Sequence, residues 1–223
     1  MSDTLLAISR SLSSDVQTLA TISHNVANLN TPGYRGVRAV PEFGAATGIR
    51  TALDLRDGGL AQTARKFDLA LRGPGFFVVE RDGRALLTRG GSFRVDAEGL
   101  LATARGERVL GQSGPIAVPV GDIRIDPLGE LWQGNQSVGQ LRIVDVADAS
   151  RLSPAGDGAY AYDGDEAQFD GRVMQGALER ANVDPADETV RLMETTRHAE
   201  SVQRAISIYD KAMDIGINRL GDN

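Results

Sequence analysis

The sequence predicts an α+β chain in which N- and C-terminal heptad helices pair as a coiled coil around a central all-β domain of the antiparallel sandwich or barrel type. Two observations predict this fold class. Apolar residues recur at alternating steps of three and four residues at both ends of the chain. Between the ends the pattern changes to a period of two residues. Heptad spacing is typical of a coiled-coil seam, whereas period-two alternation is typical of strands.

The N-terminal helix is predicted from its heptad positions. They are Leu5, Ile8, Leu12, Leu19, Ile22, Val26 and Leu29. Asp15 interrupts the series, and the neighbouring Val16 can cover that gap. The helix is expected to end at Thr31-Pro32-Gly33, because proline disfavours helical conformation before it and glycine permits the turn.

The opposite face of this helix is almost uncharged. Residues 1–34 carry only Asp3, Arg10 and Asp15, beside the titratable His24, and the rest of that face is Ser, Thr, Gln and Asn. Uncharged polar side chains are buried in contacts at lower cost than charges. We therefore hypothesise that both faces of this helix contact protein in the working state.

A second heptad series predicts the C-terminal helix. It comprises Leu192, Thr195, Ala199, Val202, Ile206, Tyr209, Met213, Gly216 and Leu220. Asp184 is suited to the N-cap and Pro185 to the first helical position. The outer face is expected to carry ion pairs four residues apart, Asp187 with Arg191 and Glu200 with Arg204, and so to face solvent.

Short strands with turns between them are predicted in the middle of the chain. The expected strands are residues 68–72, 76–80, 92–95, 100–103, 108–110, 123–125, 130–132 and 140–146. Asp82-Gly83 is a hairpin signal. Residues 150–172 are rich in Gly and Asp and are predicted to be a loop with one short strand around Tyr160. The expected organisation is a terminal helical domain of 1–34 and 183–223, an extended linker of 35–67 and a β domain of 68–182.

Composition excludes several classes of protein. The 223 residues carry a net charge of −6 and no cysteine, which excludes disulfides and thiolate chemistry and, without a basic patch, argues against nucleic acid as a partner. No apolar run reaches the roughly 18 residues of a membrane helix, so membrane insertion is not expected. Met1 to Arg10 lack a basic region followed by an apolar stretch, so no Sec signal peptide is expected.

Three clusters could suggest chemistry, and each has a simpler interpretation. Gly73-Pro74-Gly75 precedes a strand and lacks the spacing and the lysine of a phosphate loop, which favours a tight turn. The acidic residues Asp157, Asp163, Asp165, Glu166 and Asp170 lack EF-hand spacing, which favours a solvated loop. His24 and His198 could meet between the terminal helices, but no acidic pair at ligand spacing accompanies them. No catalytic, cofactor-binding or metal-binding residue is predicted, and the chain is not expected to be an enzyme.

Three stretches resemble the flagellar rod and hook protein family. His24-Asn-Val-Ala-Asn-Leu-Asn-Thr-Pro-Gly-Tyr-Arg35 is similar to the family's N-terminal signature, which Asn25, Ala27, Asn28, Thr31, Gly33, Tyr34 and Arg35 fill. Residues 71–79 and 87–93 resemble its central β motif, Gly-x-Gly-Phe-Phe followed by Thr-Arg-x-Gly-Ser-Phe. Residues 175–183 resemble the segment that leads into its C-terminal helix. The family's Arg-Ala-Tyr/Phe-Glu motif reads Arg197-His198-Ala199-Glu200 here, so the chain departs from the family at His198.

The resemblance implies a structural subunit of the bacterial flagellar basal-body rod, within the cell envelope. The flagellar type III apparatus would export it, and its terminal helices would form the inner tube of a helical assembly with itself and other rod subunits. The expected contact residues are Leu5, Leu12, Leu19, Ile22, Asn25, Val26, Ala27, Asn28, Thr31, Gly33, Tyr34, Leu192, Ala199, Val202, Ile206, Tyr209, Met213 and Leu220.

The short segment between Tyr34 and Asp68 and the sequence Gly114-Pro-Ile-Ala-Val-Pro119 are similar to proximal rather than distal rod proteins. A distal rod subunit is the alternative within the family. Outside the family, the heptads also fit a β-domain binding module that dimerises through a closed coiled coil. A third hypothesis, a hydrolase or lyase with its site in the β body, needs convergent polar residues for which the sequence offers no candidate set.

Overall fold

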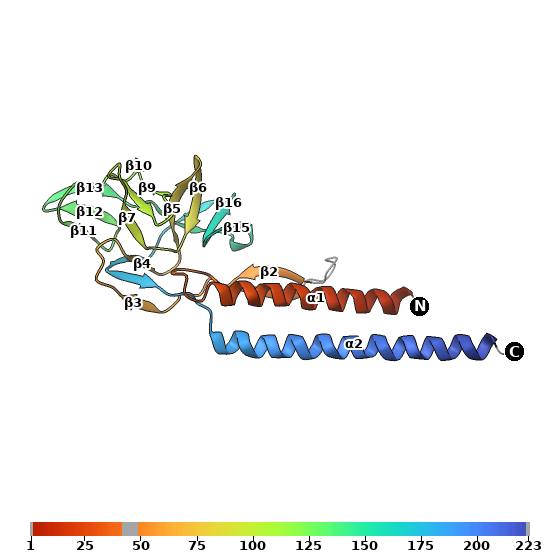
Figure 1. Cartoon of the computed structure of the whole chain (residues 1–223). Coiled ribbons are helices and arrows are strands. Elements are labelled where there is room, and N and C mark those ends of the chain that lie inside the picture. The colour runs from red at the N-terminus through yellow and green to blue at the C-terminus, as the bar shows by residue number, and fades with distance from the viewer. Residues whose placement is uncertain (1, 42–48, 222–223) are drawn as a thin grey trace. The chain divides into compact units, whose positions relative to one another are not determined.

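A computed structural model describes residues 2–41 and 49–221 and shows a long helix at each end of the chain (Figure 1). The helices are α1 (Ser2–Ala27) and α2 (Pro185–Gly221). Every strand lies between them, so the predicted arrangement of two terminal helices around a mostly β region is confirmed. The strands pair into small antiparallel sheets.

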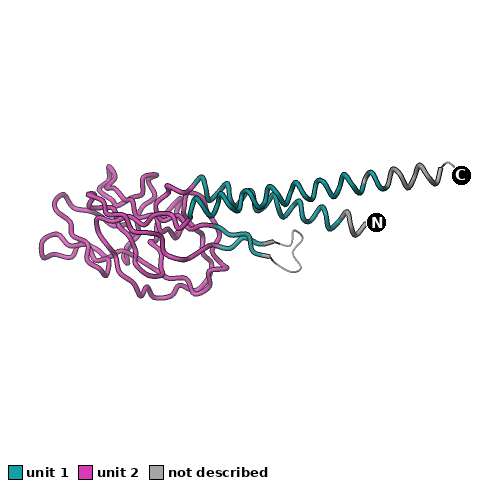
Figure 2. Tube along the Cα trace, turned by 90° about the horizontal axis from the view of Figure 1, so that it is seen from below, with its two compact units in different colours: residues 1–27, 37–52, 184–223 teal, residues 28–36, 53–183 magenta. Residues whose placement is uncertain are grey.

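The chain forms two compact units, coloured separately in Figure 2. The helical unit consists of residues 1–27, 37–52 and 184–223, and the β unit consists of residues 28–36 and 53–183. Three strands lie in the stretch 35–67, which was expected to be an extended linker. They are β1 (Val37–Pro41), β2 (Ile49–Leu53) and β3 (Leu60–Gln62). β1 pairs with β2, and β3 pairs with β19 (Ala177–Glu179).

The largest sheet of the β unit runs in the order β15-β16-β6-β5-β9-β8-β7, with β10, β14 and β17 attached to it. Its strands are β5 (Phe76–Arg81), β6 (Arg84–Thr88), β7 (Phe93–Val95), β8 (Leu101–Thr103), β9 (Arg108–Gly111), β10 (Gly114–Pro115), β14 (Ile143–Val146), β15 (Leu152–Gly156), β16 (Ala159–Tyr162) and β17 (Glu166–Gln168). A second sheet contains β11 (Ile123–Ile125), β12 (Glu130–Gln133) and β13 (Gln136–Gln140), and β4 (Leu69–Arg72) pairs with β18 (Arg172–Gln175). A short 3-10 helix spans Ala149–Arg151.

The strand β5 is buried on both faces and joins the two apolar clusters of the β unit. Phe77 packs into the larger cluster, where its ring meets the edge of Phe93 at a centroid distance of 5.2 Å. Phe76 on the other face packs into the smaller cluster against Tyr160. An uninterrupted apolar run is the pattern expected of a strand covered on both sides. The predicted hairpin is also confirmed, since Asp82 and Gly83 between β5 and β6 both have positive φ, as a type I′ turn requires.

Two predictions about the β region were wrong in detail. Residues 150–172 contain β15, β16 and β17 rather than one short strand in a loop. The predicted strand around Tyr160 is β16, whereas the two missed strands form by pairing: β15 pairs with β16, Leu152 opposite Tyr162, and β17 pairs with β14, Gln168 opposite Val144. The predicted strand 140–146 is shorter, and its first residue, Gln140, belongs to β13.

The ends of the helices test the predicted caps. The N-cap at Asp184 is confirmed, because its Oδ1 accepts a hydrogen bond of 2.8 Å from the Ala186 backbone N–H. At the other end, α1 stops at Ala27, four residues before Thr31. The Thr31 hydroxyl donates instead to Asn28 Oδ1 at 3.1 Å, within a turn. The helix therefore ends before the Thr31-Pro32-Gly33 turn at which its end was predicted.

Within the helical unit α1 and α2 lie side by side (Figure 1). The buried face of α1 holds Asp15, Ile22 and Asn25, whereas the heptad residue Val26 is 47% exposed. Val16 is 60% exposed, so the expectation that it covers the gap at Asp15 was wrong. The buried residues of α1 therefore do not form the apolar heptad row that was predicted. Supercoiling of α1 around α2 stays a prediction.

The pattern on α2 agrees better with the predicted heptads. Thr195 is buried, and Ala199, Val202, Ile206 and Tyr209 are partly buried. The predicted pair of Glu200 and Arg204 is present at 3.8 Å. Arg191, however, pairs with Glu188 at 3.4 Å rather than with Asp187, so that prediction was wrong.

Candidate functional site

The structure separates the predicted contact residues by exposure. The exposed ones are Leu12, Val26, Ala27 and Leu192. The partly buried ones are Leu19, Asn28, Thr31, Ala199, Val202, Ile206 and Tyr209. The chain's own fold buries Ile22, Asn25, Gly33 and Tyr34. The side chains of Leu5, Met213 and Leu220 lie outside the described residues.

Further exposed apolar side chains on the helices were not nominated from the sequence. They are Leu6 and Val16 on α1 and Val190, Met193 and Ile208 on α2. Ile208 is 68% exposed. The outer face of α2 therefore carries apolar side chains beside ion pairs such as that of Glu200 with Arg204, and the prediction of a charged face covered only the ion pairs. Large apolar side chains gathered on exposed helix faces are typical of contact surfaces.

The end of the N-terminal signature is held by a buried ion cluster in the β unit, which sequence reasoning missed. We call Arg35, Asp57, Arg89 and Glu179 the ion cluster. Arg89 has no exposed side-chain surface, and its Nε lies 2.8 Å from Glu179 Oε2 while its Nη2 lies 3.0 Å from Asp57 Oδ1. Arg35 contacts the same two carboxylates, at 2.9 Å and 3.2 Å. Two guanidinium groups and two carboxylates thus neutralise one another.

Electrostatics in the ion cluster follow from its burial. Desolvation lowers the pKa of Arg89, and the charge of Arg35 lowers it further, while Glu179 and Asp57 oppose both effects. The guanidinium also donates through Nη1 to the carbonyls of Gly73 and Gly75, at 2.8 Å and 2.7 Å. The Gly73-Pro74-Gly75 turn therefore presents carbonyl oxygens to a cation. A phosphate loop would present N–H groups to an anion.

The ion cluster joins all three stretches that carry the family resemblance. Arg35 ends the first stretch, Arg89 belongs to the second and Glu179 to the third. Backbone contacts run in parallel, since the Gly33 N–H donates to the Glu179 carbonyl at 2.8 Å. The Asn182 amide donates to the Asp54 carbonyl at 2.7 Å and accepts from the Gly36 N–H at 2.6 Å. All of these bonds lie within the β unit, close to places where the chain passes from one unit to the other.

Asn25 makes the corresponding connection inside the helical unit. It is 2% exposed, and its amide donates to the Val37 carbonyl and accepts from the Val37 N–H, both at 2.8 Å. This paired bond satisfies both backbone groups of the first residue of β1. The side chain nominated as a subunit contact thus joins α1 to the following strand.

His198 and Asp15 meet between α1 and α2. The His198 Nδ1 lies 2.9 Å from both oxygens of Asp15, which is 7% exposed. The sequence had singled out both residues, one as a gap in the heptads and the other as a departure from the family, without connecting them. The pair lacks further ligands, and the described residues hold no group of three His, Cys, Asp or Glu side chains that could bind a metal.

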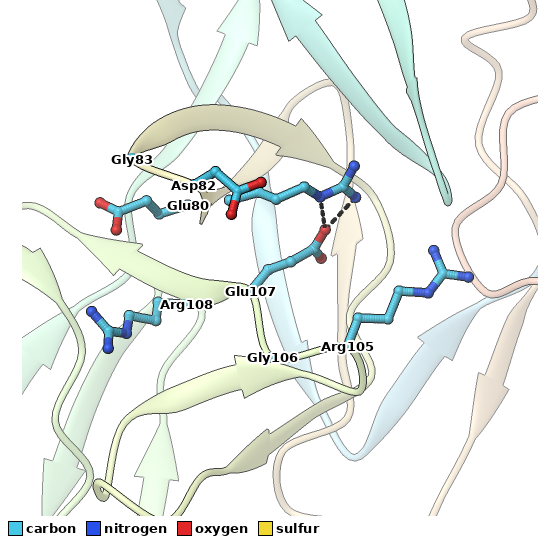
Figure 3. Close-up of a pocket in the computed structure, with 8 residues that line it drawn as sticks. Glu80, Asp82, Gly83, Arg105, Gly106, Glu107 and Arg108 are labelled. Carbon is cyan, nitrogen blue, oxygen red and sulfur yellow. Dashed lines mark hydrogen bonds and ion pairs between the residues drawn. The ribbon is translucent and has the colours of Figure 1, made fainter.

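A charged pocket of about 450 Å³ lies between the β5–β6 hairpin and the β8–β9 turn (Figure 3). Glu107 is paired in it, because Arg81 Nε donates to Glu107 Oε1 at 2.7 Å and the Thr103 hydroxyl donates to Glu107 Oε2 at 2.9 Å. Arg105 pairs with Asp157. These bonds stabilise the two turns, and no nucleophile paired with a base lines this pocket.

The acidic loop residues also pair with arginines. Asp163 lies 3.1 Å from Arg151, and Glu166 lies 2.8 Å from Arg142. This arrangement fits a solvated acidic surface rather than a calcium loop. Within the described part of the chain, no helix combines the length and hydropathy needed to cross a membrane.

Comparison with known protein families gives three matches along the chain. Residues 11–35 match the flagella basal body rod protein family, residues 70–137 match the flagellar hook protein FlgE/F/G D1 domain, and residues 174–220 match the flagellar basal body rod FlgEFG protein C-terminal region. The three matched segments contain the motifs that meet at the ion cluster.

Whole-chain similarity agrees with these matches. The chain is 30% identical to the flagellar basal-body rod protein FlgF of Caulobacter vibrioides over 90% of each chain. It is 32% identical to FlgF of Escherichia coli, over 86% of this chain and 87% of that protein. It is also 30% identical to the flagellar basal-body rod protein FlgG of Agrobacterium fabrum, over 88% of this chain and 91% of that protein.

Proposed function

The chain belongs to the flagellar basal-body rod protein family, and we propose that it is a proximal, FlgF-type subunit of the rod that polymerises through its terminal helices. The family is structural and acts in the flagellar basal body, so this chain is a building block and not an enzyme. Rod subunits work by assembling with one another, and the proposal concerns which subunit this is and which surfaces it uses.

The exposed apolar side chains of α1 and α2 are the observation that carries the proposal. Leu12, Val26 and Leu192, which the sequence nominated, are exposed in the single chain. Burying apolar surface stabilises association by roughly 25 cal/mol per Å² before the costs of association. Helices that leave such side chains open on more than one face can contact several neighbours at once. A closed dimer would need only one such face.

The alignments favour the proximal over the distal subunit. The alignment with FlgG of Agrobacterium fabrum runs over 241 positions, more than the 223 residues of this chain, so FlgG has residues that this chain lacks. The alignment with FlgF of Caulobacter vibrioides covers a similar share of this chain, 90% against 88%, in 223 positions, so FlgF has fewer extra residues than FlgG. This difference agrees with the short stretch between Tyr34 and Asp68.

The remaining parts of the proposal concern domains and export. We propose that the domain of residues 1–34 and 183–223 forms the inner tube and that residues 68–182 form an outer layer. The flagellar type III apparatus is the proposed export route.

Complementation of a gene deletion in the source bacterium tests the function. We expect deletion to abolish motility and to stop the rod before its distal part, as seen in purified basal bodies by electron microscopy. The intact gene should restore both. A deletion strain that builds complete rods would overturn the proposal.

A pair of matched substitutions tests the surface. Val26→Asp on α1 should leave a folded subunit that fails to complement, because a charge would enter an apolar contact. Val95→Asp on β7, where the valine is 37% exposed, should complement. Equal motility of the two variants would argue against contacts through α1.

A further inference from the structure

The face of α1 that is buried in the helical unit differs from the apolar face of the same helix. Its buried and partly buried residues include a series at heptad spacing, Ile8, Ser11, Asp15, Thr18, Ile22 and Asn25. We call the predicted heptad positions Leu5, Ile8, Leu12, Leu19, Ile22 and Val26 the apolar row. Leu12 and Val26 in the apolar row are 36% and 47% exposed. Successive residues of an α-helix are about 100° apart, so the centres of the two series differ by roughly 60° around the helix axis.

Burial of apolar surface alone would favour the other rotation of α1. A helix normally turns its apolar stripe toward the element against which it packs. In the buried series only Ile8 and Ile22 are apolar, and the other four members are polar. The observed rotation therefore buries less apolar surface than a rotation by roughly 60° would bury, and a polar contact has to hold it.

The contact of Asp15 with His198 supplies such a restraint. Asp15 is 7% exposed, and the His198 Nδ1 lies 2.9 Å from both of its oxygens. A carboxylate accepts hydrogen bonds and cannot donate them, so the N–H of His198 Nδ1 is the donor. Among the residues that the structure describes, no second donor reaches Asp15.

Turning α1 toward its apolar row would break this contact. A rotation by roughly 60° moves the end of a side chain on the helix by about 5 Å, which exceeds the tolerance of a hydrogen bond. Asp15 would still lie beside the buried face, where a carboxylate without a donor is costly. The bond of Asn25 to Val37 opposes the same rotation at the end of α1.

We propose that the pair of Asp15 and His198 sets the rotation of α1 and thereby keeps the apolar row out of the contact with α2. The apolar row then stays exposed for neighbouring subunits. This last step rests on the proposed function, whereas the rotation itself does not. Asp15, which interrupts the heptads, is the residue that prevents the chain from burying its own contact surface.

Asp15→Leu tests the rotation, because it completes the apolar row and removes the acceptor of His198. The chain contains no cysteine, so a single introduced cysteine can be labelled selectively with a maleimide in the purified full chain. With Asp15 present, a cysteine in place of the exposed Leu12 should react faster than one in place of the partly buried Thr18. In Asp15→Leu the order should reverse, each rate changing roughly tenfold or more, as expected when a hydrogen bond to a charged group no longer selects the rotation.

Asp15→Asn is the matched control, because its amide oxygen still accepts from His198 and both labelling rates should stay at the wild-type values. Unchanged rates in Asp15→Leu would show that the Asn25 bond to Val37 or the shape of the helices sets the rotation, and would overturn the proposal. Fast labelling at both positions in Asp15→Leu would mean that the pair only holds the helices together, which would also overturn it.

Complementation of the deletion strain separates this proposal from the proposed function. Asp15→Leu without introduced cysteines should fail to restore motility, because its apolar row is buried within the chain. If Asp15→Leu reverses the labelling order and still restores motility, the rotation stands and the use of the apolar row by neighbouring subunits fails. If the wild-type gene does not restore rods, the proposed function fails, and the labelling result still decides the rotation.

Discussion

Arg89 holds together segments that are far apart in the chain. Replacing it with methionine would leave Glu179, which has 1% exposed side-chain surface, with Arg35 as its remaining cation. The carbonyls of Gly73 and Gly75 would also lose their donor. Breaking a buried ion pair from one side costs about 3–5 kcal/mol, so we expect Arg89→Met to lower the free energy of unfolding by that amount.

Urea denaturation of the full chain measures this loss. Arg84→Met is the matched control, because Arg84 is exposed at the start of β6 and its replacement should change stability by less than about 0.5 kcal/mol. Similar midpoints for the two variants would mean that the ion cluster contributes little beyond its desolvation cost.

The raised pKa of Tyr160 predicts how the free energy of unfolding changes at high pH. Burial raises the pKa of its phenol, against a hydrogen bond from the Arg35 backbone and the Arg35 charge, which both lower it. In the unfolded chain a tyrosine ionises near pH 10. Between that value and the higher folded pKa, the folded state binds more protons, so stability is complete below about pH 10 and falls as pH rises further.

The unfolding midpoint in urea between pH 9 and pH 11 checks this expectation. The midpoint of Tyr160→Phe should fall less steeply over that range than the midpoint of the wild type, because the variant lacks the phenol that must stay protonated in the folded state. Tyr162→Phe, on the same strand, should keep the wild-type slope. Parallel curves for Tyr160→Phe and the wild type would contradict the assignment.

The members of the ion cluster were visible in the sequence, but their meeting was not. Arg35, Arg89 and Glu179 each lie in a stretch that the sequence marked as characteristic. Their separations of 54 and 90 positions carry no period that predicts contact. No sequence pattern marked Asp57 as a member of the ion cluster, because it lies outside the three characteristic stretches and a half-exposed aspartate is common in loops.

Among the elements, the turn at Gly33 brings the first motif close to the backbone of the second at Arg89 and Gly90. Its φ is +70°, and a Cβ there would overlap the backbone of Arg89 and Gly90. Gly83 in the β5–β6 hairpin has a φ of +73° but open space around it. An alanine at either position would be strained by the positive φ, but only at position 33 would its Cβ also clash with neighbouring backbone.

We therefore expect Gly33→Ala to cost about 1–3 kcal/mol more than Gly83→Ala, the usual range for overpacking. Chemical denaturation of both variants measures the difference. Equal costs would mean that the turn moves away from Arg89 at no expense, and the close approach would then be incidental.

Element by element, the sequence predicted what local patterns encode. The strand at residues 76–80, the Asp82-Gly83 hairpin and the cap at Asp184 are set by neighbouring residues, and all three are confirmed. The strands β15 and β17 and the face of α1 depend on partners elsewhere. The side chains of Asp15 and Asn25 are buried, where they bond to His198 and Val37. A search for apolar heptad positions treats such polar residues as interruptions of the helix face.

At the scale of the whole molecule, the two units differ in how much apolar core they contain. The β unit has two apolar clusters around β5. In the helical unit, Ile22 is the buried large hydrophobic residue among those that the structure describes, and the buried polar residues of this unit include Asp15, Asn25 and Thr195. Isolated helices are marginal in water, and tertiary packing normally supplies most of their stability.

Hydrogen exchange should therefore distinguish the units in the free subunit. We expect backbone amides between residues 196 and 208 of α2 to exchange at least about a hundredfold faster than those of Phe77 to Val79, because local opening needs less free energy where little apolar surface is buried. On assembly the α2 amides should become protected, since neighbouring subunits would cover Leu192, Met193 and Ile208. Slow exchange throughout the free chain would mean that the helical pair is complete alone, which would favour a closed coiled-coil dimer over a growing rod. Fast exchange that persists after assembly would place the subunit contacts elsewhere, on the β unit.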